Sequence, residues 1–284
     1  MDDTVDRQWV GDLVRATIEE DLAGGVDVTT TATVDPDQVS VAELVARGDG
    51  VVAGLEIAEL VIRQVAAPGE VELEHSVADG ASVRRGDVLM TIRGKTQQLL
   101  TAERTSLNLL CHLSGVATLT RRWVDAVEGT GAVIRDTRKT MPLLRSLEKY
   151  AVRCGGGRNH RMGLSDAALI KDNHVIAAGG VAEAFQLVRK AFPEISIEVE
   201  VDTIEDTLIA VESGAELILL DNMDVPLLRE AVEKVAGRAK LEASGGLTLD
   251  RAREVAETGV DFLAVGALTH SAPVLDIALD LKAV

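Results

Sequence analysis

The feature that most constrains the fold is a regular alternation of short apolar segments with amphipathic stretches after residue 128. Six segments have the composition of strands: AVIRDT, AALIKD, SIEVEVD, LILLDN, KLEASGG and FLAVGA. Strand, helix, strand connections of this length are right-handed and produce a parallel sheet. The second half of the chain is therefore predicted to be an α/β unit, either doubly wound or closed toward a barrel.

Polar residues at the ends of these segments favour the barrel, because the chemistry of β/α barrels lies at the carboxyl ends of several strands. A doubly wound sheet usually carries one glycine fingerprint, and neither G-x-G-x-x-G nor G-x-x-x-x-G-K-[ST] occurs. The strand-end residues are Arg138, Lys139, Lys171, Asp172, Glu200, Asp202, Asp221, Asn222, Ser244, Gly245, Gly246 and Gly266.

The first half has a different pattern. Residues 5 to 22 have apolar groups at helical spacing, and residues up to about 95 alternate with period two between Gly-Asp and Asp-Gly turns, around a helix at LEIAELVIRQVA. This predicts an antiparallel, hammerhead-like sheet. Biotinyl and lipoyl carrier hairpins have a similar pattern, but no Lys for attachment occurs before Lys95. Residues 96 to 128 are expected to form a helical connector, broken near Ser114 and Gly115.

Charge excludes some functions. The net charge of the chain is -17, whereas residues 135–174 hold nine Lys and Arg against four Asp and Glu. Long-range repulsion from phosphodiesters and membrane surfaces, with only six aromatic residues for base stacking, argues against nucleic acid and membranes as partners. A basic island in an acidic chain suits a small polyanion held in a pocket.

Compartment and redox state follow from three simpler observations. Cys111 and Cys154 lack metal or redox spacing and are expected to be free thiols in a reducing compartment. The N-terminal segment is acidic where a signal peptide would be basic and then apolar, and no apolar run reaches about 18 residues. The expected location is the cytoplasm.

Two groups of residues indicate a polar interior. Glu198, Glu200 and Asp202 alternate along one strand, so their side chains share a face that points inward in a barrel and needs cations such as Lys139 and Lys171. A purely structural lattice of ion pairs is the alternative. The glycine-rich ends EASGG and AVGA, with His270 nearby, could form a phosphate cup, although glycine at strand ends is also ordinary turn chemistry.

These motifs resemble a known family. The segments DTRKT, GGGRNHRMGLSDAALIKDNH, EVEVDT, LLDNM and EASGG, together with EDLAGGVDVTT and AERTSLNLLCHLSGVAT, are similar to those of quinolinate phosphoribosyltransferase, also called nicotinate-nucleotide pyrophosphorylase (carboxylating). The resemblance runs nearly end to end. It implies a homodimer whose active site is completed by the partner subunit. It also implies an N-terminal α/β sandwich with the helical connector (residues 1–110), an incomplete α/β barrel (111–270) and a C-terminal helix that packs back on the N-terminal domain (271–284).

The implied reaction joins quinolinate and phosphoribosyl pyrophosphate to give nicotinate mononucleotide, pyrophosphate and carbon dioxide, with Mg²⁺ as cofactor. The family assigns catalysis to Lys139, Glu200, Asp221 and Lys171, and Mg²⁺, through water, to Glu200 and Asp221. Quinolinate contacts fall on Arg104 of the partner subunit and on Arg138, His160, Arg161 and Lys171. Phosphoribosyl and phosphate contacts fall on Thr137, Lys139, Ser244, Gly245, Gly246, Gly266, Ala267 and His270.

Chemistry supports these assignments, since guanidinium groups bind planar carboxylates bidentately. Carboxylates would stabilise an oxocarbenium-like ribosyl group, and no nucleophilic residue is needed. Arg145, Lys149, Arg153 and Arg158 are expected to be helix-surface or interface charges.

The sequence departs from the family pattern at Leu143-Leu144, where a glycine is expected, and at Arg158. Three alternatives remain: a Schiff-base aldolase using Lys139 or Lys171, a homologue associated with molybdate transport, and a non-catalytic metabolite binder.

Overall fold

The computed structural model describes Met1 and residues 5–282, which divide into two compact units. The first unit comprises Met1–Leu119, Ser146–Gly156 and Ser271–Val284, and the second Thr120–Arg145 and Gly157–His270. The division differs from the expected one, because residues 111–119 and Ser146–Gly156 belong with the first unit. No helix among the described residues is both long and apolar enough to cross a membrane.

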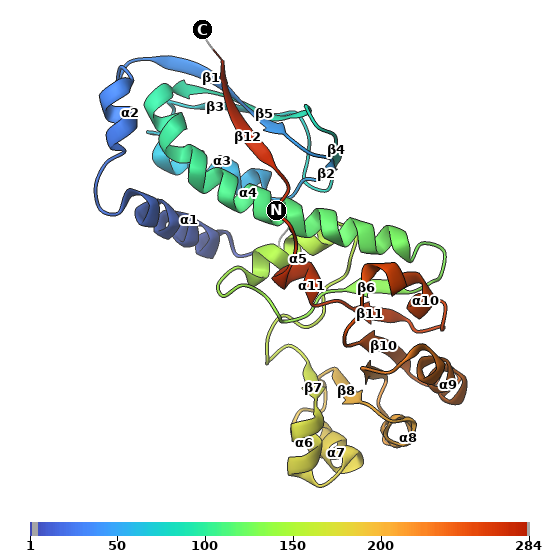
Figure 1. The fold of residues 1–284 in the computed structure, drawn as a ribbon. Coiled ribbons are helices and arrows are strands. Elements are labelled where there is room, and N and C mark those ends of the chain that lie inside the picture. Colours follow the sequence, from blue (N-terminus) through green and yellow to red (C-terminus); the bar gives the residue numbers. More distant parts are fainter. Residues whose placement is uncertain (2–4, 283–284) are drawn as a thin grey trace. The chain divides into compact units, whose positions relative to one another are not determined.

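The first unit is built on a four-stranded antiparallel sheet of order β12-β1-β5-β3 (Figure 1). Its buried residues, such as Leu44, Ile92 and Leu110, are apolar and come from strands and helices alike. The elements are α1 (Arg7–Leu22), α2 (Val28–Thr33), β1 (Val39–Ala46), β2 (Gly50–Val51), α3 (Leu55–Val65), β3 (Glu72–His75), β4 (Ser82–Val83), β5 (Val88–Lys95), α4 (Thr96–Ala126), α5 (Arg145–Cys154) and β12 (Ile277–Lys282).

Two expectations for the first unit are wrong. Helix α4 continues through Ser114 and Gly115 without a break. A Cβ atom on Gly115 would lie 2.3 Å from the Pro273 carbonyl oxygen, so the glycine allows close packing of the C-terminal segment rather than ending the helix. That segment forms strand β12, not the expected helix, and pairs with β1 in the register Val41↔Lys282 to Ala46↔Ile277.

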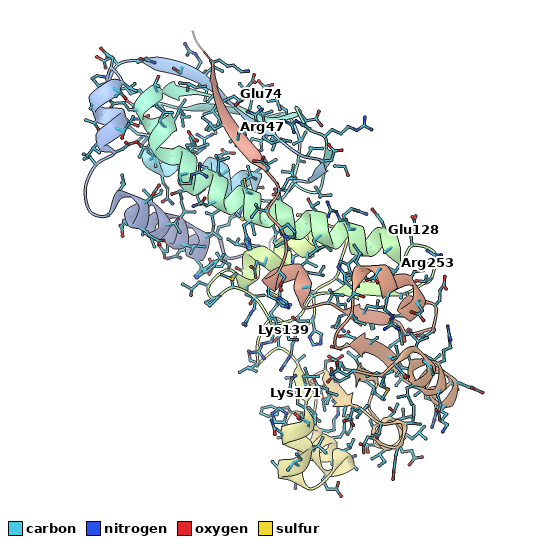
Figure 2. All side chains as sticks on the ribbon, viewed as in Figure 1. Arg47, Glu74, Glu128, Lys139, Lys171 and Arg253 are labelled. Carbon is cyan, nitrogen blue, oxygen red and sulfur yellow. The ribbon has the colours of Figure 1, made fainter. Side chains whose placement is uncertain are left out.

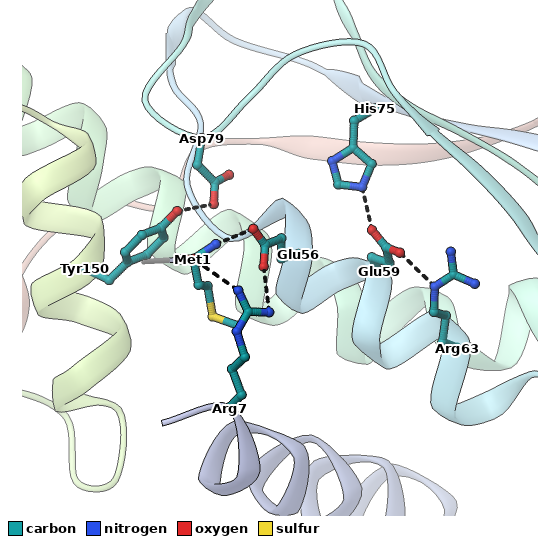
Figure 3. A network of polar contacts seen from close by, with 8 residues as sticks. All are labelled: Met1, Arg7, Glu56, Glu59, Arg63, His75, Asp79 and Tyr150. Atoms are coloured by element: carbon teal, nitrogen blue, oxygen red, sulfur yellow. Dashed lines mark hydrogen bonds and ion pairs between the residues drawn. The ribbon is translucent and has the colours of Figure 1, made fainter. Parts of the chain in front are cut away.

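Polar contacts join several elements of the first unit (Figure 3). Glu56 on α3 accepts from the amino group of Met1 and pairs with Arg7, and Glu59 bonds both Arg63 and His75 at 2.7 Å. The Tyr150 hydroxyl on α5 donates to Asp79 at 2.8 Å. Most of these groups are partly exposed, so each pair contributes little to stability.

The second unit is a six-stranded parallel sheet of order β6-β11-β10-β9-β8-β7. Strand β11, the last of this sheet in the sequence, pairs with β6, the first, as in a barrel. Strands β6 and β7 lie at the two edges of the sheet and do not pair with each other, so the barrel is incomplete, as expected. Its elements are β6 (Val133–Arg135), β7 (Ala168–Ile170), α6 (Asp172–Ala178), α7 (Val181–Ala191), β8 (Ile197–Val201), α8 (Ile204–Glu212), β9 (Leu217–Asp221), α9 (Val225–Val235), β10 (Lys240–Ser244), η1 (Leu249–Arg251), α10 (Ala252–Ala256), β11 (Phe262–Ala264) and α11 (Ala267–His270).

Local sequence explains where the helices after strands β8 and β9 begin. Thr203 and Asp224 cap α8 and α9, accepting from the backbone N–H groups of Asp206 and Leu227 at 3.0 Å. Pro226 occupies the first turn of α9, where no backbone donor is needed. Each of these two strands is therefore joined to its helix by a short loop. The side chains of such loops lie at the edge of the sheet where the parallel strands have their carboxyl ends.

Candidate active site

A cavity of about 540 Å³ opens at the carboxyl ends of the parallel strands. Strands β7, β8, β9, β10 and β11 contribute residues to its wall, and β6 contributes through the residues that follow it, as expected for a barrel-type site. Residues that the sequence singled out make up most of the lining, which consists of Thr137, Arg138, Lys139, His160, Arg161, Leu169, Lys171, Glu200, Leu219, Asp221, Asn222, Ser244, Gly245, Gly246 and Ala264.

Three cations of the cavity have no acidic partner in the described part of the chain. Among the described residues, no carboxylate lies within ion-pair distance of Arg138, Lys139 or Arg161. The Nε atoms of Arg138 and Arg161 are also buried without a hydrogen-bond acceptor. Burial and the neighbouring Arg138 charge lower the pKa of Arg161. Two partly buried guanidinium groups that repel each other, each with a buried and unused Nε donor, indicate a site for an anion.

Lys171 differs from these three cations because its Nζ atom pairs with Glu200 Oε2 at 2.9 Å. The expected pairing of the β8 carboxylates with Lys171 is thus confirmed for Glu200, while Lys139 forms no such pair. A lysine held by a carboxylate lacks the apolar surroundings that activate an amine for Schiff-base chemistry. Figure 2 shows Lys139 and Lys171 on separate segments of the second unit.

The backbone around Lys139 is held from two directions. Its N–H donates to Thr137 Oγ1 at 3.0 Å, and its carbonyl oxygen accepts from Thr269 Oγ1 at 2.8 Å. A Cβ atom on Gly266 would lie 3.0 Å from Lys139 Cδ and 3.3 Å from His270 Nε2. Gly266 and His270 do not line the cavity themselves, but they flank the lysine that does.

The acidic side of the cavity is formed by Glu200 and Asp221. Asn222 donates to Asp221 Oδ2 at 2.8 Å and adopts a left-handed backbone with φ of 52°. A Cβ atom on Gly245 would lie 2.2 Å from Asn222 Oδ1, so only glycine fits beside this asparagine. Asn222 was noted at the strand end but was not assigned to the site. Its position directly after Asp221 was the available signal.

Glu200 and Asp221 also face a smaller cavity of about 230 Å³. Asp172, Asp202 and Asp206 contribute to its wall. Hard cations such as Mg²⁺ prefer carboxylate and water oxygens, so the donor set at this junction fits the expected metal.

A layer of buried charges lies deeper in the same sheet. Glu198 and Glu242 are 3% and 0% exposed, and His160 is 7% exposed. His160 Nε2 lies 2.7 Å from Glu198 Oε2 and 3.5 Å from Glu242 Oε1. Arg135 pairs with Glu242 Oε2. The sequence placed Glu198 on the inward face of its strand but did not single out Glu242, which precedes the cavity residue Ser244 by two positions.

Some residues predicted for the site do not line the cavity. Arg104 is exposed on α4 in the first unit, and its side chain forms no hydrogen bond or ion pair with the described part of the chain. Ala267 and His270 belong to the short helix α11. Lys149, expected to be a helix-surface or interface charge, is instead fully buried on α5. Cys111 and Cys154 are free and half-buried, and burial raises the pKa of both thiols.

Both halves of the chain match models of one family. Residues 27–114 match the N-terminal domain of quinolinate phosphoribosyl transferase, and residues 116–280 match its C-terminal domain. The two matches together cover most of the chain.

Individual proteins agree with the family models. A nicotinate-nucleotide pyrophosphorylase (carboxylating) of Mycobacterium leprae (strain TN) is 53% identical over 273 residues, which is 95% of this chain and 96% of that protein. A chloroplastic protein of the same name from Arabidopsis thaliana is 40% identical over 95% of this chain and 82% of its own length. The structure of the nicotinate-nucleotide pyrophosphorylase from Francisella tularensis superposes with a TM-score of 0.92 at 34% identity, covering 98% of each chain. With matches over both domains and this level of identity, the chain belongs to the quinolinate phosphoribosyltransferase family.

Proposed function

We propose that the cavity at the carboxyl ends of the parallel strands is the active site for the family reaction. In that reaction the phosphoribosyl group of phosphoribosyl pyrophosphate passes to quinolinate, and nicotinate mononucleotide, pyrophosphate and carbon dioxide are released. The observation that carries the assignment is the pair of buried, unpartnered Nε atoms on Arg138 and Arg161, which are matched by the two adjacent carboxylates of quinolinate.

The basic side of the cavity suits the pyridine dicarboxylate. Guanidinium groups can each hold one planar carboxylate through two parallel hydrogen bonds, and Arg138 and Arg161 have free donors for this. His160 and Lys171 line the same cavity and complete the quinolinate site. With both carboxylates fixed, the ring nitrogen is held ready to attack the ribose carbon.

The glycine-rich side suits phosphate. Gly245 and Gly246 have φ of 87° and 57° and carry no side chain, so backbone N–H groups next to Ser244 are open to anionic oxygens. Thr137 and Lys139 lie in the same cavity, and Gly266, Ala267 and His270 follow β11 beside Lys139. These residues would hold the phosphates of the second substrate.

The carboxylates stabilise the reacting sugar. As the bond from the ribose carbon to pyrophosphate breaks, positive charge develops on the ring, and Glu200 and Asp221 place negative charge beside it. The same two residues would hold Mg²⁺ through water, and the ion would neutralise the leaving pyrophosphate. After attack, the bond between the ring and the adjacent carboxylate breaks, carbon dioxide leaves, and the electron pair stays on the ring carbon, where the positive pyridinium nitrogen stabilises it. That carbon then takes up a proton from solvent to give nicotinate mononucleotide.

One assay tests the proposal directly. Purified protein given quinolinate, phosphoribosyl pyrophosphate and Mg²⁺ should release pyrophosphate and carbon dioxide in equal amounts with nicotinate mononucleotide. Nicotinate, which lacks the second carboxylate, is the matched control and should react poorly, because one guanidinium would remain unpaired. Equal use of both acids, or absence of nucleotide, would contradict the assignment and leave the homologue associated with molybdate transport or a simple binding protein in its place.

We also propose that the protein is a homodimer in which Arg104 serves the site of the neighbouring subunit. Its exposed position on α4, within the other unit from the cavity, supports a role across an interface. Arg104→Ala should abolish activity with folding and dimerisation intact. Mixing it with inactive Lys139→Ala should restore part of the activity, because one site of each mixed dimer contains both wild-type residues. Differently tagged chains establish that subunits exchange, and a mixture that exchanges and stays inactive would refute the shared site.

A further inference from the structure

Arg145, the first residue of α5, connects two loops of the second unit. Its Nε atom donates to Thr140 Oγ1 at 3.0 Å, and its Nη1 atom donates to the carbonyl oxygen of Met162 at 3.2 Å. The side chain does not line the cavity, and within the described residues it forms no ion pair. An arginine whose planar group bonds two segments in fixed directions acts as a link between them.

The first loop carries two cations of the cavity, Arg138 and Lys139. The backbone N–H of Thr140 donates to the Arg138 carbonyl oxygen at 2.9 Å, which closes a tight turn centred on Lys139. The Thr140 hydroxyl donates to the same carbonyl oxygen at 3.4 Å and accepts from Arg145. The bond from Arg145 therefore holds the turn that immediately follows Arg138.

The second loop, residues 162–167, sets the direction of Arg161. Asp166 accepts from the backbone N–H of Met162 at 2.6 Å, which folds the loop. At the other end of the loop, the carbonyl oxygen of Ala167 accepts from Arg161 Nη1 at 3.2 Å. This bond leaves the Arg161 Nε atom, which is buried and has no acceptor, for a ligand. The position of the loop thus decides where the unused edge of this guanidinium group lies.

No strand pairing within the described sheet fixes the distance between these two loops. The first loop follows β6 and the second precedes β7, which lie at the two edges of the sheet and do not pair with each other. Arg138 and Arg161 carry like charges, and their repulsion favours separation of the loops. The side chain of Arg145 supplies a hydrogen-bonded link across this seam.

We propose that Arg145 is a positioning residue, which holds Arg138 and Arg161 at the separation that a ligand with two adjacent carboxylates requires. This inference rests on the proposed function, in which quinolinate bridges the two guanidinium groups. A rigid dianion binds tightly when both groups are already in place, because ordering of the loops then takes nothing from the free energy of binding. A ligand with one carboxylate needs only one of the two groups and gains little from the link.

Arg145→Lys tests the link while keeping the positive charge, because an ammonium group lacks the fixed fork of donors of a guanidinium group. Measured by nuclear magnetic resonance titration, which also detects weak binding, the dissociation constant for quinolinate should rise about tenfold, the value of one hydrogen bond to a charged group. The constant for nicotinate should change by less than about twofold. Arg229→Lys, an exposed change on α9, is the matched control and should leave both constants unchanged. Unchanged binding of quinolinate by Arg145→Lys, or equal weakening for both acids, would overturn the proposal.

Changes at Thr140 separate the hydrogen bond from the other properties of Arg145. Thr140→Val removes the hydroxyl acceptor and should weaken quinolinate binding, whereas Thr140→Ser keeps the hydroxyl and should bind within about twofold of the wild type. Combined with Arg145→Lys, Thr140→Val should add little, because both changes break the same link. A combined effect equal to the product of the two single effects would show that the residues act separately and would refute the link.

Hydrogen exchange observes the link without any ligand. In Arg145→Lys the backbone amides of residues 138–144 and 162–167 should exchange faster, while those of β9 and β10 keep wild-type rates. Loop amides at wild-type rates would refute the link even in an active enzyme, and faster exchange throughout the unit would show a general loss of stability instead. Should this variant not fold, Thr140→Val takes its place in both measurements. Faster loop exchange in the variant of a protein whose wild type does not bind quinolinate would count against the proposed function alone.

Discussion

The two sheets of this protein use their buried faces differently. In the antiparallel sheet, inward residues such as Leu44 and Ile92 are apolar, and the buried hydroxyls of Ser40 and Thr96 bond each other at 2.7 Å. In the parallel sheet, equivalent inward positions carry Glu198 and Glu242. Buried carboxylates cost stability unless they are paired or protonated. The inward positions of the first sheet therefore serve packing, while the second sheet also carries charged groups at buried positions.

The sharpest test of this difference removes charge from the parallel sheet. Glu200→Gln and Asp221→Asn keep the side-chain shape, so we expect folding stability close to that of the wild type. Each should lower kcat by about 10² to 10³, because loss of a preorganised charge near a developing cation typically costs that much. Steady-state kinetics and thermal unfolding measure both effects. Normal turnover by both variants would show that these acids have no catalytic role.

The converse test adds one methyl group to the first unit. Gly115→Ala would place a Cβ atom 2.3 Å from the Pro273 carbonyl oxygen, so α4 or the segment before β12 must shift. We expect the free energy of unfolding to fall by about 1–3 kcal/mol, as in other overpacked sites, despite the better helix propensity of alanine. Urea unfolding measures the loss. Gly129→Ala is a poor control because its φ is positive. Gly11→Ala, inside helix α1 and with nothing nearer than 3.9 Å, is well matched and should raise the free energy of unfolding by up to about 1 kcal/mol.

The smallest expected effect concerns the loop after Lys139. Leu143 is 73% exposed and has φ of 67°, a left-handed conformation that suits glycine. Leu143→Gly should raise the free energy of unfolding by no more than about 1 kcal/mol, since relief of strain is partly offset by the greater freedom of glycine when unfolded. Leu144→Gly, at a position without positive φ, should instead destabilise the protein. Equal effects of the two changes would show that the leucine is not strained.

Local patterns were sufficient to predict much of the fold. The six parallel strands, their helices and the antiparallel first half all follow from periodicity, because backbone geometry alone decides which side chains share a face. The same reasoning placed Arg138, Lys171, Glu200 and Asp221 at strand ends, and parallel strands bring such ends to one edge. The cavity was thus largely predictable in position, although the roles of its residues remain proposals.

Tertiary structure alone decided the features that depend on contacts between distant segments. Gly115 interrupts a helical pattern in the sequence, and only the approach of Pro273 explains why the helix continues. The C-terminal segment becomes a strand because β1 offers it an edge with unpaired backbone groups. Glu242 looks like any strand residue until His160 and Glu198 are brought beside it, from positions 82 and 44 residues earlier in the chain. Burial and proximity set the charge of such a group, and neither is encoded in the residues next to it.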